Sequence, residues 1–315
     1  MKILGIFTGR PKQVTEFYMQ TALKAAEEAG CEVELVNLRQ LNINPCNGCC
    51  VCHRGGRPDG KPGCVYDDDM VWLDEKILEC DGMIVAAPCF ECSPPSEMKK
   101  FCDRLGPSHD VMIRKDMDER RKAQGLSTND PRWYNDRPVA FVSHGGSEWT
   151  TLGLPILSII AVPLGMTIVD LVNISFQGTI LKEGTVDRVK AVGRAVAANC
   201  GKTADEMTFM GDPGVCPCCH NNTMVLEPGS DKIICAACGL EGKISVENGK
   251  VQTHYTPEQL KESHVTISGK TIHMLDMTGR GKEIMRFRME HAKEIDQLVK
   301  EGTAYYTTSR PDRNK

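Results

Sequence analysis

Residues 81–90 have the sequence Asp-Gly-Met-Ile-Val-Ala-Ala-Pro-Cys-Phe, and this stretch decides the fold class. Its apolar part, residues 82–87, is typical of a strand buried on both faces, and a predicted helix follows at 94–105. The same alternation of strand and helix recurs on both sides. Further strands are expected at 2–7, 32–38, 138–143 and 166–174, and further helices at 15–30, 67–80 and 184–200. The pattern predicts an α/β fold with a doubly wound, five-stranded parallel sheet, whose ligands bind at the carboxyl ends of the strands.

The composition is that of a soluble globular protein. The chain has 315 residues, of which 41% are hydrophobic and 25% charged, so bulk disorder is excluded. A formal net charge of -4 argues against a dedicated nucleic-acid or membrane binder. The N-terminus enters an apolar strand without an export signal, which predicts a cytoplasmic location. Residues 149–169 carry no charge, but Pro155 and Pro163 interrupt them, which favours a buried helix and strand over a membrane span.

Composition also changes along the chain, which predicts several parts. The α/β domain is expected at 1–203, a linker at 204–215, a cysteine-bearing module at 216–254, and a mixed-charge segment with one helix (283–301) at 255–315. Within the first part, residues 46–64 form a cysteine-bearing loop and 107–136 a charged insertion. We expect the insertion to be a solvated helix and loop, with a lid or a subunit contact as the alternative.

The module at 216–254 carries a metal-site pattern. Cys216 and Cys219 form one Cys-x-x-Cys pair, and Cys235 and Cys238 form another after fifteen intervening residues. This is the spacing of a four-cysteine zinc ribbon, and a module of this size needs its metal to fold. Zn²⁺ is favoured, and a rubredoxin-like iron that carries electrons is the alternative.

Several motifs occur in a fixed order in the first 203 residues. They are Asn44-Pro45-Cys46-Asn47-Gly48-Cys49 with Asp67-Asp68-Asp69-Met70, the 81–90 stretch, Lys99-x-Phe101-x-Asp103-Arg104, and Gly145-Gly146 after the fourth strand. Together they resemble the iron–sulfur flavoprotein and NADPH-dependent FMN reductase branch of the flavodoxin-like superfamily. The resemblance implies FMN, held by the loops that follow the first, third and fourth strands.

The FMN phosphate is expected at the turn after the first strand. Hydroxyl groups and backbone N–H groups converge there on a helix N-terminus, with Thr8, Arg10 and Thr15 as the expected contacts. This loop is one residue shorter than the family pattern and lacks its second glycine and its asparagine, and Arg10 and Lys12 supply positive charge instead.

The flavin ring is expected between two loops. The contacts implied by the resemblance are Pro88, Cys89, Phe90 and Glu91 in one loop and His144, Gly145 and Gly146 in the other. Glu91 and His144 are candidate catalytic proton donors, and each has an alternative, Glu91 as a solvated acid and His144 as a cap of the fourth strand. No Gly-x-Gly-x-x-Gly motif is present, so NAD(P)H is expected to dock transiently over the flavin.

The resemblance also implies an iron–sulfur site. Cys46, Cys49, Cys52 and Cys64 match the compact motif that holds a [4Fe-4S] cluster, with Cys50 as a spare thiol. The alternative is that these thiols hold no cluster, as in related flavin reductases. Cys89 and Cys92 form a further Cys-x-x-Cys pair beside the predicted flavin, either a redox dithiol or, as we favour, two small loop residues.

These features predict an FMN-dependent oxidoreductase. Electrons would pass between NAD(P)H or a low-potential carrier and a small-molecule acceptor or protein electron carrier, with the [4Fe-4S] cluster as a relay. The resemblance implies a homo-oligomer. The alternative is a non-catalytic electron-transfer or redox-sensing adaptor whose ribbon docks a partner.

Overall fold

The computed structural model describes residues 1–305 apart from 55, 56 and 58. The chain divides into two compact units, Met1–Lys270 and Thr271–Lys315. Within the described residues no helix is both long enough and apolar enough to cross a membrane.

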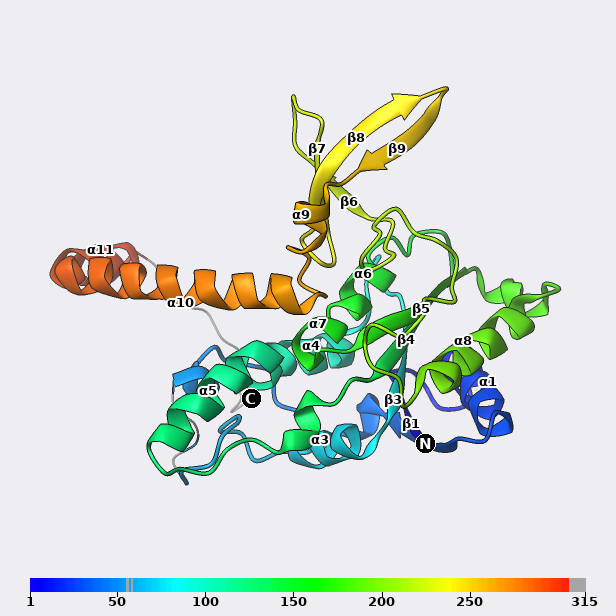
Figure 1. Cartoon of the computed structure of the whole chain (residues 1–315), viewed down its shortest axis with the longest axis horizontal. Coiled ribbons are helices and arrows are strands. Elements are labelled where there is room, and N and C mark those ends of the chain that lie inside the picture. Colours follow the sequence, from blue (N-terminus) through cyan, green and yellow to red (C-terminus); the bar gives the residue numbers. More distant parts are fainter. Residues whose placement is uncertain (55–56, 58, 306–315) are drawn as a thin grey trace, which may run out of the picture. The chain divides into compact units, whose positions relative to one another are not determined.

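The first unit is built on a five-stranded sheet in the order β2-β1-β3-β4-β5 (Figure 1). Every neighbouring pair is parallel. The strands are β1 (Lys2–Phe7), β2 (Glu32–Asn37), β3 (Gly82–Pro88), β4 (Pro138–Gly145) and β5 (Thr167–Ser175). β3 and β4 are buried along their whole length, which explains their continuous apolar sequences. The predicted doubly wound sheet is therefore confirmed, with each strand within two residues of its expected ends.

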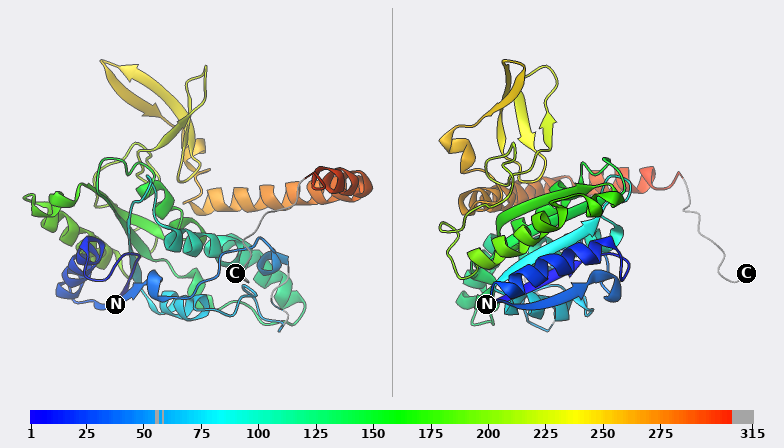
Figure 2. Two further views of the ribbon diagram at one scale, coloured as in Figure 1. Left: turned by 180° about the vertical axis from the view of Figure 1, so that it is seen from behind. Right: turned by 90° about the vertical axis from the view of Figure 1, so that its right-hand side faces the viewer.

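Helices cover both faces of this sheet (Figure 2). One face is covered by α1 (Val14–Glu28) and α8 (Thr185–Asn199), whose apolar side chains form one core with the strands. A Cβ added at Gly193 of α8 would lie 1.9 Å from the carbonyl oxygen of Ala22, so this glycine permits the close approach of the two helices.

The opposite face carries the second core. It is covered by α3 (Met70–Glu79), α4 (Ser96–His109), α6 (Gly153–Ser158) and α7 (Ala161–Leu164). Short segments complete the connections: η1 (Leu38–Gln40), α2 (Val51–Arg54) and η3 (Gln177–Leu181).

The charged insertion contains a helix whose outer face is exposed, as expected, but whose inner face buries charged side chains. It contains α5 (Val111–Ala123) and η2 (Pro131–Tyr134). α5 buries Arg114, Asp118 and Arg121. The hydroxyl of Tyr134 donates to the Asp118 carboxylate at 2.6 Å, so polar side chains of the insertion pair with one another away from water.

A second, antiparallel sheet follows the linker. Its order is β6 (Met224–Leu226), β7 (Lys232–Cys235), β8 (Glu241–Glu247) and β9 (Lys250–His254), and β6 with β7 forms a hairpin between the two cysteine pairs. The module contacts the parallel-sheet domain through Asn221, which donates to the Ser158 hydroxyl at 3.0 Å. Thr223 also donates to the carbonyl of Thr151 at 3.1 Å.

The C-terminal segment is more helical than expected. It contains α9 (Pro257–Leu260), α10 (Ile267–Glu290) and α11 (Ala292–Gly302). The prediction of a single helix at 283–301 is wrong, because the backbone leaves the helical region at His291 (φ -109°, ψ 16°).

Candidate functional site

The turn after β1 offers unsatisfied donors for a phosphate. Thr8 is fully buried, and its hydroxyl has no hydrogen-bond partner among the described residues. Gln13 precedes α1 as its N-cap, but its side chain donates to the carbonyl of Lys12 and makes no capping hydrogen bond, so the first-turn N–H groups of this fifteen-residue helix lack a side-chain cap from it. The ideal Cβ of Gly9 lies 3.6 Å from the Thr15 hydroxyl, which places Thr15 against the same turn. A phosphate would satisfy the hydroxyl and the helix N-terminus together.

Two cationic residues of this turn behave differently from each other. Arg10 is exposed and forms no ion pair in the part of the chain that the structure describes. Lys12 adopts a left-handed backbone (φ 59°), and its N–H donates to the Glu16 carboxylate at 2.6 Å. Glu16 therefore occupies one backbone donor at the helix start, and the side chains of Arg10 and Lys12 are both exposed beside it.

The loop after β3 presents an aromatic ring on a tight turn. Phe90 and Ser93 exchange backbone hydrogen bonds at 2.8 and 3.2 Å, and Glu91 and Cys92 between them both have positive φ (47° and 71°). This is the geometry of a two-residue turn with both central residues left-handed. The Phe90 ring is 59% exposed, so it is open to a flat ligand at the carboxyl end of the sheet.

The loop after β4 lies beside it. The Cys89 N–H donates to the carbonyl of His144 at 2.7 Å, which holds the two predicted ring-binding loops together. Gly145 is tightly packed, since an added Cβ would lie 2.2 Å from the Thr150 methyl group, whereas Gly146 faces open space.

His144 is buried with an unpartnered Nδ1, counting only the described residues. Burial lowers its pKa, so the imidazole is neutral near pH 7. The edge of its ring faces Tyr18 of α1, with centroids 5.6 Å apart. Tyr18 is a residue that the sequence analysis missed: its hydroxyl is buried and also unpartnered in the described region, and burial raises its pKa.

The thiols of Cys89 and Cys92 are each within hydrogen-bond distance of a different hydroxyl group. Cys89 Sγ lies 3.3 Å from the Ser143 hydroxyl, and burial raises the pKa of this thiol. Cys92 Sγ lies 3.0 Å from the Thr151 hydroxyl, which lowers the pKa of the second thiol. Both cysteines are free, and each thiol has its own hydroxyl partner.

These groups fit FMN. An orphaned hydroxyl and an uncapped helix N-terminus suit its phosphate, and an exposed aromatic ring beside an open glycine suits its flat ring system. The contribution of each predicted contact residue stays a prediction.

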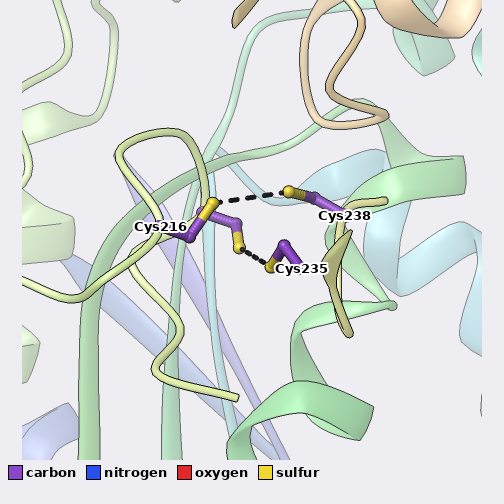
Figure 3. Close-up of side chains that lie close together, drawn as sticks. Cys216, Cys235 and Cys238 are labelled. Carbon is purple, nitrogen blue, oxygen red and sulfur yellow. Dashed lines mark hydrogen bonds between the residues drawn. The ribbon is translucent and has the colours of Figure 1, made fainter. Parts of the chain in front are cut away.

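The module contains a compact set of four cysteines (Figure 3). The Sγ atoms of Cys216, Cys219, Cys235 and Cys238 all lie within 4.8 Å of one another, and all four residues are buried. The Cys216–Cys238 and Cys219–Cys235 sulfur pairs are 3.6 and 3.4 Å apart. Tetrahedral coordination with Zn–S bonds of about 2.3 Å requires sulfurs about 3.8 Å apart, so the set fits one ion.

Each cysteine pair forms a turn of the same geometry. Gly239 follows the second pair with φ 71°, and His220 follows the first with φ 59°. A left-handed histidine is unfavourable, and here its ring stacks on Phe209 with centroids 3.5 Å apart. His220 therefore supports the turn through this ring contact.

The cysteine loop at 46–64 is more open. Cys46, Cys49 and Cys50 are exposed, and Cys52 and Cys64 are partly buried. Burial raises the pKa of Cys52 to about 11, and the neighbouring thiols of the loop add to this shift. The described thiols of this loop therefore shift the pKa of Cys52. Their sulfur atoms do not come together around one point as the four cysteines of the module do.

A buried ion pair holds the start of this loop. The Asp68 carboxylate accepts from the Arg104 guanidinium at 2.5 Å and from the backbone N–H of Asn44 at 2.9 Å. Arg104 also donates to the carbonyl of Asn44 at 3.0 Å. Two of the sequence motifs therefore meet in space, and they fix the residues that lead into Cys46.

Loops at the carboxyl ends of a doubly wound parallel sheet, with groups that fit FMN, define the class of flavodoxin-like oxidoreductases. The family of NADPH-dependent FMN reductases matches residues 1–176, more than half of the chain. The chain belongs to this family, and it is a flavin oxidoreductase.

Two relatives match almost the whole chain. A flavone synthase of Aspergillus candidus is 31% identical over 292 residues, which is 88% of each chain. A solved structure of a flavone reductase has a TM-score of 0.83 and 29% identity, and the match covers 99% of this chain and 100% of the other.

Iron–sulfur flavoproteins match a shorter region. One from Methanosarcina thermophila is 37% identical over 106 residues, or 33% of this chain and 52% of that protein. One from Archaeoglobus fulgidus is 36% identical over 109 residues, or 34% of this chain and 46% of that protein. The match spans about half of these relatives.

Proposed function

We propose that this protein is an FMN-dependent oxidoreductase that uses NAD(P)H to reduce a conjugated carbon–carbon double bond in a planar, flavone-like acceptor. The observation that carries the proposal is the match over nearly the full length to a flavone synthase and a flavone reductase. Both names concern a flavone, which one protein makes and the other reduces.

Bound FMN would supply the hydride chemistry, taking a hydride from the nicotinamide and passing it to the acceptor. The chain would hold the FMN phosphate through Thr8, Arg10, Thr15 and the start of α1. Phe90 would form an aromatic wall for the acceptor, and Glu91 on the same exposed turn would deliver the proton that completes the reduction. The neutral His144 would donate or accept a hydrogen bond near the flavin.

The test is anaerobic turnover with FMN-loaded protein, NADH or NADPH, and flavone. We expect oxidation of one nicotinamide for each flavone reduced, with a product about two mass units heavier. Phe90→Ala should raise the KM for flavone and weaken the binding of FMN, whereas Phe17→Ala, which removes an exposed ring from α1, should change neither. Failure to oxidise NAD(P)H with flavone, quinones or nitro compounds would refute the enzyme proposal and favour the adaptor.

We also infer that the thiols of Cys46, Cys49, Cys52 and Cys64 hold a [4Fe-4S] cluster that relays single electrons. The support is the short match to iron–sulfur flavoproteins and the presence of four cysteines in this one loop. Iron and sulfide analysis of anaerobically purified protein tests this. Cys49→Ala should lower the iron content, and Cys50→Ala should not. An unchanged iron content in the Cys49 variant would refute the proposed cluster.

The remaining assignments follow from the same proposal. Residues 1–203 would form the flavin domain, 216–254 a ribbon that holds Zn²⁺, with iron as the alternative, and 255–315 a helical extension. The homo-oligomer implied by the resemblance stays a prediction, testable by light scattering.

A further inference from the structure

A cavity of about 490 Å³ lies between α3, α4, α5 and the segment 61–66. We name it the α5 cavity and define it by Lys61, Tyr66, Arg104, Arg114 and Trp133, which line it together with other residues. Its volume is in the range of small-molecule sites in proteins.

Arg114 is the most unusual residue of this cavity. It is 4% exposed, yet the described residues place no carboxylate within ion-pair distance of it. Its Nε donates to the carbonyl of Ser108 at 2.7 Å, and its guanidinium lies 3.9 Å from the centre of the Trp133 ring. Its Nη1 has no hydrogen-bond partner in the described part of the chain. A buried guanidinium with a free donor is costly unless an anion accepts from it.

A second arginine adds to this charge. Arg104 pairs with Asp68 through its terminal nitrogens, but its buried Nε is unpartnered among the residues described. Lys61 is exposed at the edge of the cavity and forms no ion pair in the described region. Arg57, also at the edge, pairs with Asp59 at 3.3 Å.

The acidic residues that line the cavity are already engaged. Asp74 accepts from His109 at 2.8 Å. Glu75 and Asp130 both pair with Arg132, at 3.4 and 2.7 Å. None of these three carboxylates forms an ion pair with Arg114, so its free Nη1 has no carboxylate acceptor among the described residues.

We propose that the α5 cavity binds a small organic anion through its carboxylate or phosphate group, at a site separate from the flavin. The free Nη1 of Arg114 and the free Nε of Arg104 would donate to the anion, and Lys61 would close the edge. Guanidinium groups suit both oxyanions because their donors are planar and forked.

The experiment uses FMN-saturated protein, so that the phosphate turn after β1 is already filled. Inorganic pyrophosphate and citrate serve as the phosphate and carboxylate probes in separate calorimetric titrations. At least one should saturate at one site per chain. Arg114→Gln should weaken its affinity at least tenfold, equivalent to about 1.4 kcal/mol.

Arg120→Gln is the matched control. Arg120 lies on the same helix, is exposed and pairs with Asp116, and its loss changes the net charge by the same amount. This variant should bind as the parent does. Equal weakening in both variants would show diffuse attraction and overturn the proposal, as would the absence of saturable binding for both probes.

Two further measurements test the proposal if Arg114→Gln does not fold. Lys61→Gln alters only an exposed edge residue and should weaken binding severalfold. Probe binding should also change the fluorescence of Trp133, and Trp133→Phe should abolish that change while Trp72→Phe retains it. A different outcome is that the parent binds neither probe and Lys61→Gln loses iron. This would overturn the proposal and show that the positive side chains serve the cysteine loop, because Cys64 also lines the cavity.

Discussion

Replacement of Asp68 by asparagine tests the buried ion pair that holds the cysteine loop. The side chains of Asp68 and Arg104 are each 1% exposed, so the substitution leaves a guanidinium buried without a counter-charge. Removing one partner of a buried pair destabilises a protein by about 3–5 kcal/mol. Asparagine retains the shape and part of the hydrogen bonding, so we expect a loss of about 3 kcal/mol.

The assay is urea unfolding followed by circular dichroism. Asp103→Asn is the control, because Asp103 pairs with Lys99 on the exposed face of α4 and such pairs contribute about 0–1 kcal/mol. The double variant Asp68→Asn/Arg104→Met should recover part of the loss, since it also removes the unpaired charge. A loss below about 1 kcal/mol for Asp68→Asn would refute the reasoning.

The same pair predicts a pH dependence. Burial acts to raise the pKa of Asp68, but hydrogen bonds from Arg104 and Asn44 outweigh it and the pKa is lowered. The carboxylate therefore contributes stability above its unfolded pKa of about 3.9, and this is lost as the pH falls through the lower folded value. The parent should lose more stability than Asp68→Asn between pH 5 and pH 3.

Three further predictions concern the sites. Thr8→Val should weaken the affinity for FMN about tenfold or more, because a hydrogen bond from a hydroxyl to a charged phosphate contributes about 1.5–3 kcal/mol. An unchanged affinity in a fluorescence titration would show that Thr8 does not bind the phosphate. Cys235→Ala should abolish metal binding and lower the melting temperature, whereas Cys218→Ala should retain the metal, and elemental analysis distinguishes them. Gly145→Ala should destabilise the protein by about 1–3 kcal/mol through the clash described above, and Gly146→Ala should be tolerated; equal melting temperatures would contradict this difference.

The sequence predicted the sheet closely because each strand is a local signal. Residues 82–87 are apolar without interruption, and a strand buried on both faces requires this composition. The cluster of four cysteines in the module was equally predictable, since the spacing of the two Cys-x-x-Cys pairs is typical of a site that holds one metal ion.

The insertion could not be predicted in the same way. Arg114 and Asp118 look like solvated charges in the sequence, and only the tertiary partners Trp133 and Tyr134 make their burial favourable. Tyr18 was missed for a related reason, because it lies on the apolar face of α1 and nothing local distinguishes its unpartnered hydroxyl from a core aromatic.

The docking contacts of the ribbon have a consequence for the order of assembly during synthesis. Asn221 and Thr223 contact Ser158 and Thr151, residues that leave the ribosome 63 and 72 positions earlier. The docking surface on α6 and the preceding loop therefore exists before the second cysteine pair emerges. Folding proceeds from the N-terminal domain in such chains, so the metal would be loaded last, onto a module that already has a surface to close against. A nascent chain that runs short of metal would stall with its flavin domain formed and four thiols exposed to oxidation.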